Sequence, residues 1–334
     1  MPKLPLPGFV NAHSHAFQRA LRGRTEGGDF WAWRDAMLGL AGYQTPESVK
    51  AEYVTVYEEM LHRGYTAVGE FHYLGFDAAV AAAEASADAG ITFVLLYAAY
   101  AAPPFAQPSV AAYLADVERL RKRGIAVGVA PHSVRACPPE WLDEIGRYAE
   151  RDGLVLHVHA CEQPKEIEDC LAAHGVRPIE LLARHGCLGP RTTIVHATHA
   201  SDAELDLLRD AGSRICVCPT TEANLGDGFA PIDRICRRRV GMCIGSDSNV
   251  RIDPLEELRE LDGIARRQTR RRDAVPLERL LAFGADEGAA SLGIERWADV
   301  LVDAEHESLR GVDEADVLAA LVYGSDGQAL TGEA

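Results

Sequence analysis

Short apolar runs alternate along this chain with longer segments rich in alanine, leucine and charged residues. The apolar runs are almost continuously hydrophobic, which is typical of strands in a parallel sheet whose outer face is covered by helices. Strand character is found at Gly8–Asn11, Thr66–Phe71, Ile91–Tyr97, Ile125–Ala130, Leu154–His159, Thr192–His196, Ile215–Cys218 and Gly241–Gly245. Helical character is found at Glu47–Arg63, Asp77–Ala89, Val110–Arg123, Pro139–Arg151, Gln163–Ala173, Ala203–Asp210 and Pro254–Arg271. This alternation predicts an α/β fold, the (β/α)8 or TIM barrel.

The length of 334 residues and the hydrophobic share of 47% suffice for one large core. We predict that the barrel occupies residues 1–290 and that residues 291–334 form a short C-terminal extension. Within that extension, Trp297–Val302 is expected to form a short strand. The remainder is acidic and weakly patterned, so partial disorder is one expectation for it.

Charge and cysteine usage exclude several classes of protein. A net charge of −16 argues against nucleic acid as a partner, because a phosphate backbone needs a basic surface. The longest apolar stretch, Ile91–Phe105, is interrupted by two prolines, which argues against a membrane span. The eight cysteines include no Cys-x-x-Cys pair, and Met1–Pro7 has no apolar signal core. We therefore expect a cytoplasmic protein with reduced, mostly buried thiols.

Residues of the types that bind metals lie at or just after the ends of predicted strands. His13 and His15 lie two residues apart, so that on a strand they face the same way and can hold one ion. His159 ends the fifth predicted strand and Asp247 follows the eighth. Three imidazoles and a carboxylate can bind a divalent metal and leave a position open for water, which is typical of a hydrolytic site. Zinc suits this donor set, with iron and manganese as alternatives.

Two further residues are candidates for acid–base chemistry. Glu162 lies three residues after His159, where it can turn back towards the metal and shuttle a proton; the alternative is a surface glutamate at a helix start. His196 ends the sixth predicted strand and is expected to polarise the substrate or hold the water. We interpret His157 as a buried histidine beside the metal site, and His199 as part of a loop.

Because the chain is strongly acidic, an arginine near the candidate metal site is a candidate for binding an anionic substrate. Arg135 follows His132 in one loop and could hold a carboxylate through a two-pronged contact. A salt bridge at the rim is an equally good interpretation of Arg135 taken alone.

Eight short sequence motifs resemble those of a known family. The chain resembles the deaminase branch of the amidohydrolase superfamily, and within it the formimidoylglutamate deiminases, which act on N-formimino-L-glutamate in histidine degradation. The resemblance runs from about Pro7 to Arg272 and rests on Asn11-Ala-His13-Ser-His15-Ala-Phe-Gln18-Arg19-Ala20, Phe30-Trp-Ala-Trp-Arg34, Glu70-Phe-His-Tyr73, Pro131-His132-Ser-Val-Arg135, His159-Ala-Cys-Glu162-Gln163, Val195-His196-Ala-Thr-His199, Cys218-Pro-Thr-Thr-Glu222-Ala-Asn-Leu-Gly-Asp227 and Gly245-Ser-Asp247-Ser-Asn249.

The resemblance implies a site and a reaction. It implies zinc on His13, His15, His159 and Asp247, with Glu162, His196 and Asp247 as catalytic groups. His132 and Gln18 would contact the formimino end, and Arg34, Tyr73 and Arg135 would hold the carboxylates of a dianionic small molecule. The product would be N-formyl-L-glutamate, with release of ammonia.

The chain departs from the family's pattern at its ends, where strands of a small β-sandwich are expected. We therefore expect that small domain to be reduced or missing, with residues 291–334 as its remnant. Two other functions stay open: a deaminase of an amino-heterocycle such as cytosine or guanine, and a non-catalytic paralogue that binds a metal or metabolite. The oligomeric state also stays open, with a homodimer as one alternative.

Overall fold

Eight parallel strands form the centre of the fold. The computed structural model describes residues 3–325 and 327–332. Its larger sheet runs in the order β2-β3-β4-β5-β6-β7-β8-β9, so each strand pairs with its neighbour in the sequence. The strands span Phe9–Ser14, Tyr65–His72, Thr92–Ala99, Val127–Pro131, Leu156–Ala160, Thr192–His196, Arg214–Val217 and Gly241–Ile244. The predicted barrel and its eight strands are confirmed, and β7 has the predicted bounds.

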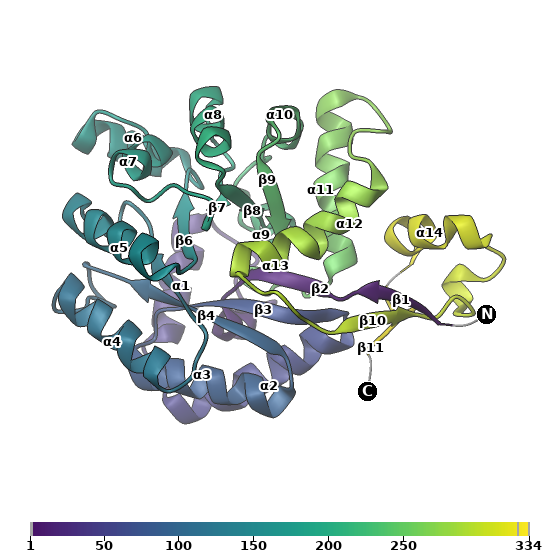
Figure 1. The fold of residues 1–334 in the computed structure, drawn as a ribbon, viewed down its shortest axis with the longest axis horizontal. Coiled ribbons are helices and arrows are strands. Elements are labelled where there is room, and N and C mark those ends of the chain that lie inside the picture. The colour runs from purple at the N-terminus through teal and green to yellow at the C-terminus, as the bar shows by residue number, and fades with distance from the viewer. Residues whose placement is uncertain (1–2, 326, 333–334) are drawn as a thin grey trace.

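Helices α1 to α13 surround this sheet, and α14 lies to one side of the barrel near the chain ends (Figure 1). They are α1 to α14, at Phe30–Ala41, Pro46–His62, Phe76–Ala89, Val110–Lys122, Pro139–Asp152, Pro164–His174, Pro178–Arg184, Asp202–Ala211, Pro219–Leu225, Ile232–Arg238, Pro254–Thr269, Leu277–Gly284, Asp286–Leu292 and Val317–Gly324. All seven predicted helices are present. The sequence analysis did not assign α1, α7, α9, α10, α12, α13 or α14, most of which have seven or eight residues.

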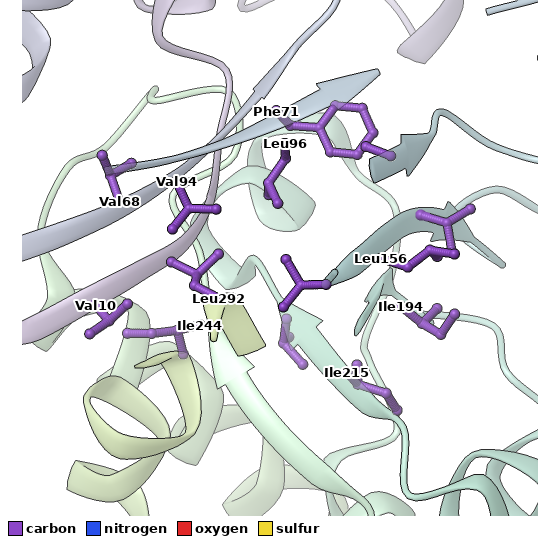
Figure 2. Close-up of a cluster of buried hydrophobic side chains, with 14 of the residues drawn as sticks. Val10, Val68, Phe71, Val94, Leu96, Leu156, Ile194, Ile215, Ile244 and Leu292 are labelled. Atoms are coloured by element: carbon purple, nitrogen blue, oxygen red, sulfur yellow. The ribbon is translucent and has the colours of Figure 1, made fainter. Parts of the chain in front are cut away.

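Apolar side chains from many strands meet in the core. Val10, Val68, Val94, Ile194 and Ile244 are among those that Figure 2 shows, and all are buried. Branched residues of this kind suit strands, because their stiff side chains pack well on a pleated surface. The core therefore follows directly from the apolar runs in the sequence.

The barrel closes where β2 meets the chain that follows β9. Asp247 N donates to His13 O at 3.0 Å, and His15 N donates to Asp247 O at 2.8 Å. Gly245 permits this approach, because a Cβ atom at that position would lie 2.7 Å from His13 O. The closure brings the ends of the first and last barrel strands together, although more than two hundred residues separate them.

The strand β1 (Leu4–Pro7) lies outside the barrel. It pairs antiparallel with β10 (Asp299–Val302), which pairs with β11 (Leu330–Gly332). The three strands lie beside the barrel near both chain ends (Figure 1). These strands form a separate three-stranded sheet in the order β1-β10-β11.

The C-terminal extension contains β10, α14, β11 and the short 3-10 helices Glu307–Leu309 and Glu314–Asp316. The expected strand at Trp297–Val302 is present as β10. The domain boundary at residue 290 stays a prediction. Within residues 3–325 and 327–332, no helix has both the length and the hydropathy that crossing a bilayer requires.

Candidate metal centre and active site

The four predicted metal ligands converge at the carboxyl ends of the strands. His13 Nε2 and His15 Nε2 each lie 3.4 Å from Asp247 Oδ1. His159 Nε2 lies 3.1 Å from His13 Nε2 and 3.4 Å from His15 Nε2. All four residues are buried, and their donor atoms lie within 4.8 Å of one another. The structure therefore gathers one ligand set from β2 and the residue that follows it, from β6 and from the segment after β9.

Hydrogen bonds from the opposite ring nitrogens orient two of these histidines. His15 Nδ1 lies 2.8 Å from Phe71 O, and His159 Nδ1 lies 2.9 Å from His132 O. A carbonyl only accepts, so each Nδ1 carries the proton and each Nε2 presents a lone pair to the common centre. The lone pairs of His15 Nε2 and His159 Nε2 face each other at 3.4 Å and repel unless a cation lies between them. The donor set therefore fits a divalent metal.

Burial keeps the imidazoles of this centre neutral. It lowers the pKa of His13 to about 3, and it lowers the pKa of His15 and of His159 as well. Burial opposes ionisation of Asp247, but the hydrogen bond with His13 and the charge of His196 outweigh it and hold the Asp247 pKa below its usual value. Neutral imidazoles and an ionised carboxylate are the forms that bind a metal.

The backbone at two of the site residues is in a sparsely populated conformation. His196 has a φ of 70° and Asp247 a φ of 45°, both in the left-handed region that favours glycine. Such residues cost of order 1 kcal/mol or more each, and they persist where the surrounding structure holds them. Here the strained backbone turns both side chains towards the same point.

His196 is surrounded by three carboxylates. Its Nδ1 lies 3.2 Å from Glu222 Oε1, and its Nε2 lies 3.8 Å from Glu162 Oε1 and 3.8 Å from Asp247 Oδ2. Burial lowers the pKa of this imidazole, but the charge of Glu162 and the hydrogen bond to Glu222 raise it more, to about 10. His196 is therefore prepared to donate a hydrogen bond towards the metal centre.

Glu222 is a site residue to which the sequence analysis gave no role. It lies in α9 directly after β8, and its Oε1 also accepts a hydrogen bond from Cys218 N at 2.9 Å. Its only sequence signal was its place in the string after Cys218, because a short helix has no clear periodicity. Its contacts identify it as the residue that orients His196.

A cavity of about 360 Å³ opens above the metal centre, and all five predicted substrate-binding residues line it. They are Gln18, Arg34, Tyr73, His132 and Arg135. Gln18 Nε2 donates to Tyr73 Oη at 2.9 Å, which links the two side chains. The volume lies in the range of sites for small metabolites.

The two cavity arginines differ in their surroundings. Arg135 Nη2 lies 3.1 Å from Glu162 Oε2, so the arginine expected to bind a carboxylate also contacts the expected proton shuttle. Arg34, on α1, has no carboxylate within ion-pair distance among the described residues. Both of the sequence interpretations of Arg135, carboxylate binding and a salt bridge, remain compatible with this position.

Several other residues at strand ends do not line the cavity. Glu70 is buried behind the site, where it accepts a hydrogen bond from Ala16 N at 2.7 Å. His157 is buried but points away from the metal ligands, with Nε2 3.0 Å from Ser291 O in α13. His199 lies in the loop between β7 and α8, as expected.

All eight cysteines are free, and seven are buried. The prediction that most of the thiols are buried is confirmed. None of the described residues contributes to a disulfide.

A (β/α)8 barrel with a three-histidine, one-aspartate cluster at its carboxyl rim defines the class of metal-dependent barrel hydrolases. The sequence model of the Amidohydrolase family matches residues 5–298. The chain belongs to the amidohydrolase family.

Individual relatives support this membership. A formimidoylglutamate deiminase of Pseudomonas aeruginosa is 35% identical over 94% of this chain and 79% of its own length. A 5-methylthioadenosine/S-adenosylhomocysteine deaminase of Nitratidesulfovibrio vulgaris is 30% identical to this chain. That match covers 78% of this chain and 60% of the relative. The crystal structure of an adenosine deaminase from Xanthomonas campestris with bound zinc matches with a TM-score of 0.90 at 25% identity, over 98% of this chain and 78% of that one.

Proposed function

We propose that this protein is a metal-dependent deaminase that converts N-formimino-L-glutamate and water to N-formyl-L-glutamate and ammonia. The observation that carries the proposal is one cavity lined by two arginines and by three of the four candidate metal ligands, His15, His159 and Asp247. The named activity of the Pseudomonas aeruginosa relative supports the same substrate. The reaction class is hydrolysis of a C–N bond in a linear amidine.

His13, His15, His159 and Asp247 would hold the metal. We propose zinc, because the histidine-rich donor set suits it and because the Xanthomonas campestris structure carries it. When bound, the cation acts as a Lewis acid that makes water a nucleophile near neutral pH.

Glu162 is the group that moves protons. Its Oε1 lies 3.8 Å from His196 Nε2 at the wall of the cavity, and Arg135 holds its other oxygen at 3.1 Å. In that position Glu162 accepts a proton from the attacking water and returns it to the leaving nitrogen, which departs as ammonia. His196, oriented by Glu222, donates a hydrogen bond to the reacting group and stabilises the charge that develops there.

Arg34 and Arg135 recognise the two carboxylates. Only Nη2 of Arg135 bonds to Glu162, so other N–H groups of its guanidinium remain able to bind a substrate carboxylate. Arg34 supplies a second cation, for which the described residues hold no carboxylate partner. Two fixed cations offset the repulsion that a net charge of −16 imposes on a dianion.

The cavity also favours a second candidate. Aromatic side chains of Phe30, Trp31, Tyr73 and Tyr100 line it, and such surfaces can stack on a flat heterocycle. The named activities of the Nitratidesulfovibrio vulgaris and Xanthomonas campestris proteins concern purine nucleosides. Adenosine and 5-methylthioadenosine carry no carboxylate and S-adenosylhomocysteine carries one, so two cavity arginines fit a dianion better than these substrates.

Ammonia release separates the two candidates. The zinc-loaded protein is assayed with N-formimino-L-glutamate, N-formiminoglycine, adenosine, 5-methylthioadenosine and guanine. We expect N-formimino-L-glutamate to be the best substrate, and N-formiminoglycine, which lacks the side-chain carboxylate, to be poorer by about tenfold or more. Faster turnover of a purine would favour the second candidate.

Two variants test the carboxylate contact. Arg34→Met should raise KM for N-formimino-L-glutamate by about tenfold or more, because a hydrogen bond to a charged group is worth about 1.5–3 kcal/mol. Lys165→Met is the matched control: Lys165 lines the same cavity, but its ammonium is 2.9 Å from Asp169 Oδ1. An equal rise in KM in both variants would show a general effect of charge rather than recognition by Arg34.

A further inference from the structure

Three cysteine thiols lie inside the barrel next to the candidate metal centre. Cys216 on β8 pairs in register with Cys243 on β9, and Cys218 follows the end of β8. Together with Ala12 and Val195 they form a small cluster of their own, in which every residue is 0% exposed. The proposed reaction uses none of these thiols.

Cys218 belongs to a second group of potential ligands. Its Sγ atom, one ring nitrogen of His196 and one carboxylate oxygen of Asp247 lie within 4.8 Å of one another, and all three residues are buried. Tetrahedral zinc bonds of roughly 2.0–2.3 Å place donor atoms about 3.3–3.8 Å apart. A small contraction would therefore suffice for zinc, and a larger soft cation needs still less.

The two oxygens of Asp247 face different histidines, so each group of ligands can use its own oxygen. Asp247 Oδ1 faces His13 and His15, whereas Asp247 Oδ2 faces His196 Nε2 at 3.8 Å. Glu222 engages the other ring nitrogen of His196, which leaves Nε2 as the donor. Glu162 Oε1, 3.8 Å from the same Nε2, offers a fourth donor atom.

We propose that His196, Cys218 and Asp247 form a second, inhibitory site for a soft divalent cation, bridged to the first centre by Asp247. A thiolate selects soft cations such as cadmium, or zinc in excess, over magnesium or calcium. Binding releases two protons to solvent, the thiol proton of Cys218 and the Nε2 proton of His196, as the metal–sulfur and metal–nitrogen bonds form. The inhibitory effect rests on the proposed function, because it removes His196 and Asp247 from the reaction; the binding itself does not.

The test is a titration of the zinc-loaded protein with Cd²⁺. Wild-type protein should bind one cadmium beyond its resident metal, develop the ultraviolet charge-transfer band of a cadmium thiolate, and lose ammonia release in the same range. Cys218→Ser should lack the band and need at least about tenfold more Cd²⁺ for the same occupancy. Cys243→Ser is the matched control, because Cys243 lies in the same buried cluster but outside the ligand group; it should bind cadmium like the wild type.

Three results would overturn the proposal. One is the absence of a thiolate band in the wild-type protein, a measurement that does not depend on whether any variant folds. Another is a band that persists in Cys218→Ser, and the third is cadmium that replaces the resident metal one for one. If the protein released no ammonia from any substrate while band and stoichiometry appeared as expected, the proposed function would fail and the metal site would stand.

Discussion

Replacement of Glu222 by glutamine changes charge at the site with little change of shape. Glu222 Oε1 accepts both hydrogen bonds, from His196 Nδ1 at 3.2 Å and from Cys218 N at 2.9 Å. Oε2 is buried and has no hydrogen-bond partner among the described residues. In Glu222→Gln the amide oxygen can keep both bonds and the amide nitrogen takes the position of Oε2, so the variant removes the negative charge and adds a buried NH2 group.

The size of the effect follows from the strength of these bonds. A bond to a charged group contributes about 1.5–3 kcal/mol and a neutral one about 0.5–1.5 kcal/mol. The difference of about 1–1.5 kcal/mol predicts a fall in kcat/KM of roughly five- to tenfold for Glu222→Gln. Glu222→Ala loses the acceptor as well, and roughly 10–100-fold is expected.

The pH dependence of stability and of kcat/KM tests whether Glu222 acts through the pKa of His196. Glu222 helps to raise the pKa of His196 from 6.5 to about 10, so the glutamine variant should have a lower His196 pKa. The stability that this raised pKa provides to the metal-free protein is complete below pH 6.5 and is lost as the pH rises through about 10. Glu222→Gln should therefore be less stable at neutral pH, and the difference should vanish at high pH. The alkaline limb of the kcat/KM profile should also move to lower pH.

The assay combines kinetics with NMR titration of the His196 ring in metal-free protein, which does not depend on activity. Glu257→Gln is the control, because Glu257 is also buried and its Oε2 accepts a hydrogen bond from Thr220 N in α9 at 3.0 Å without contacting His196. An unchanged His196 titration in Glu222→Gln, or an equal shift in Glu257→Gln, would refute the reasoning.

Three further predictions concern neighbouring groups. Glu162→Gln should retain the metal but lower ammonia release by about 10²-fold or more, as metal analysis and turnover will show; wild-type turnover would exclude a proton-shuttle role. Removal of the metal by a chelator should lower the Tm, since a ligand at a hundredfold excess over its Kd contributes about 2.7 kcal/mol; a Tm that is the same with and without metal would contradict the metal centre. Burial raises the pKa of Glu70 from 4.5 to about 8, so the metal-free protein should lose stability as pH rises through that window, and Glu70→Gln should abolish the loss. Urea unfolding at several pH values measures the free energy of unfolding. If this free energy depended on pH equally in both proteins, Glu70 would not be the cause.

The sequence by itself determined the barrel and its strands. Apolar runs such as Thr192–His196 are short and buried, and each is followed by a helix, so few arrangements other than a parallel barrel are possible. Short helices such as α9 and α13 escaped prediction, because seven residues give too few turns for a periodic signal.

The sequence also determined which residues lie at one rim. Parallel strands in a barrel all end on the same side, so His13, His159 and Asp247 had to share that side whatever the loops do. The five cavity residues came from the family resemblance, and the structure places all of them in one cavity. Their roles as substrate contacts remain predictions.

Only the tertiary structure decided which atoms face one another. The pairing of Glu222 with His196, of Arg135 with Glu162, and of Cys218 with Asp247 depends on distances of a few ångströms between segments that are remote in the chain. Periodicity reports which face of an element is buried, but it does not report rotation, backbone strain or the register at which a barrel closes. Those quantities separate the two oxygens of Asp247 and give each a different set of partners.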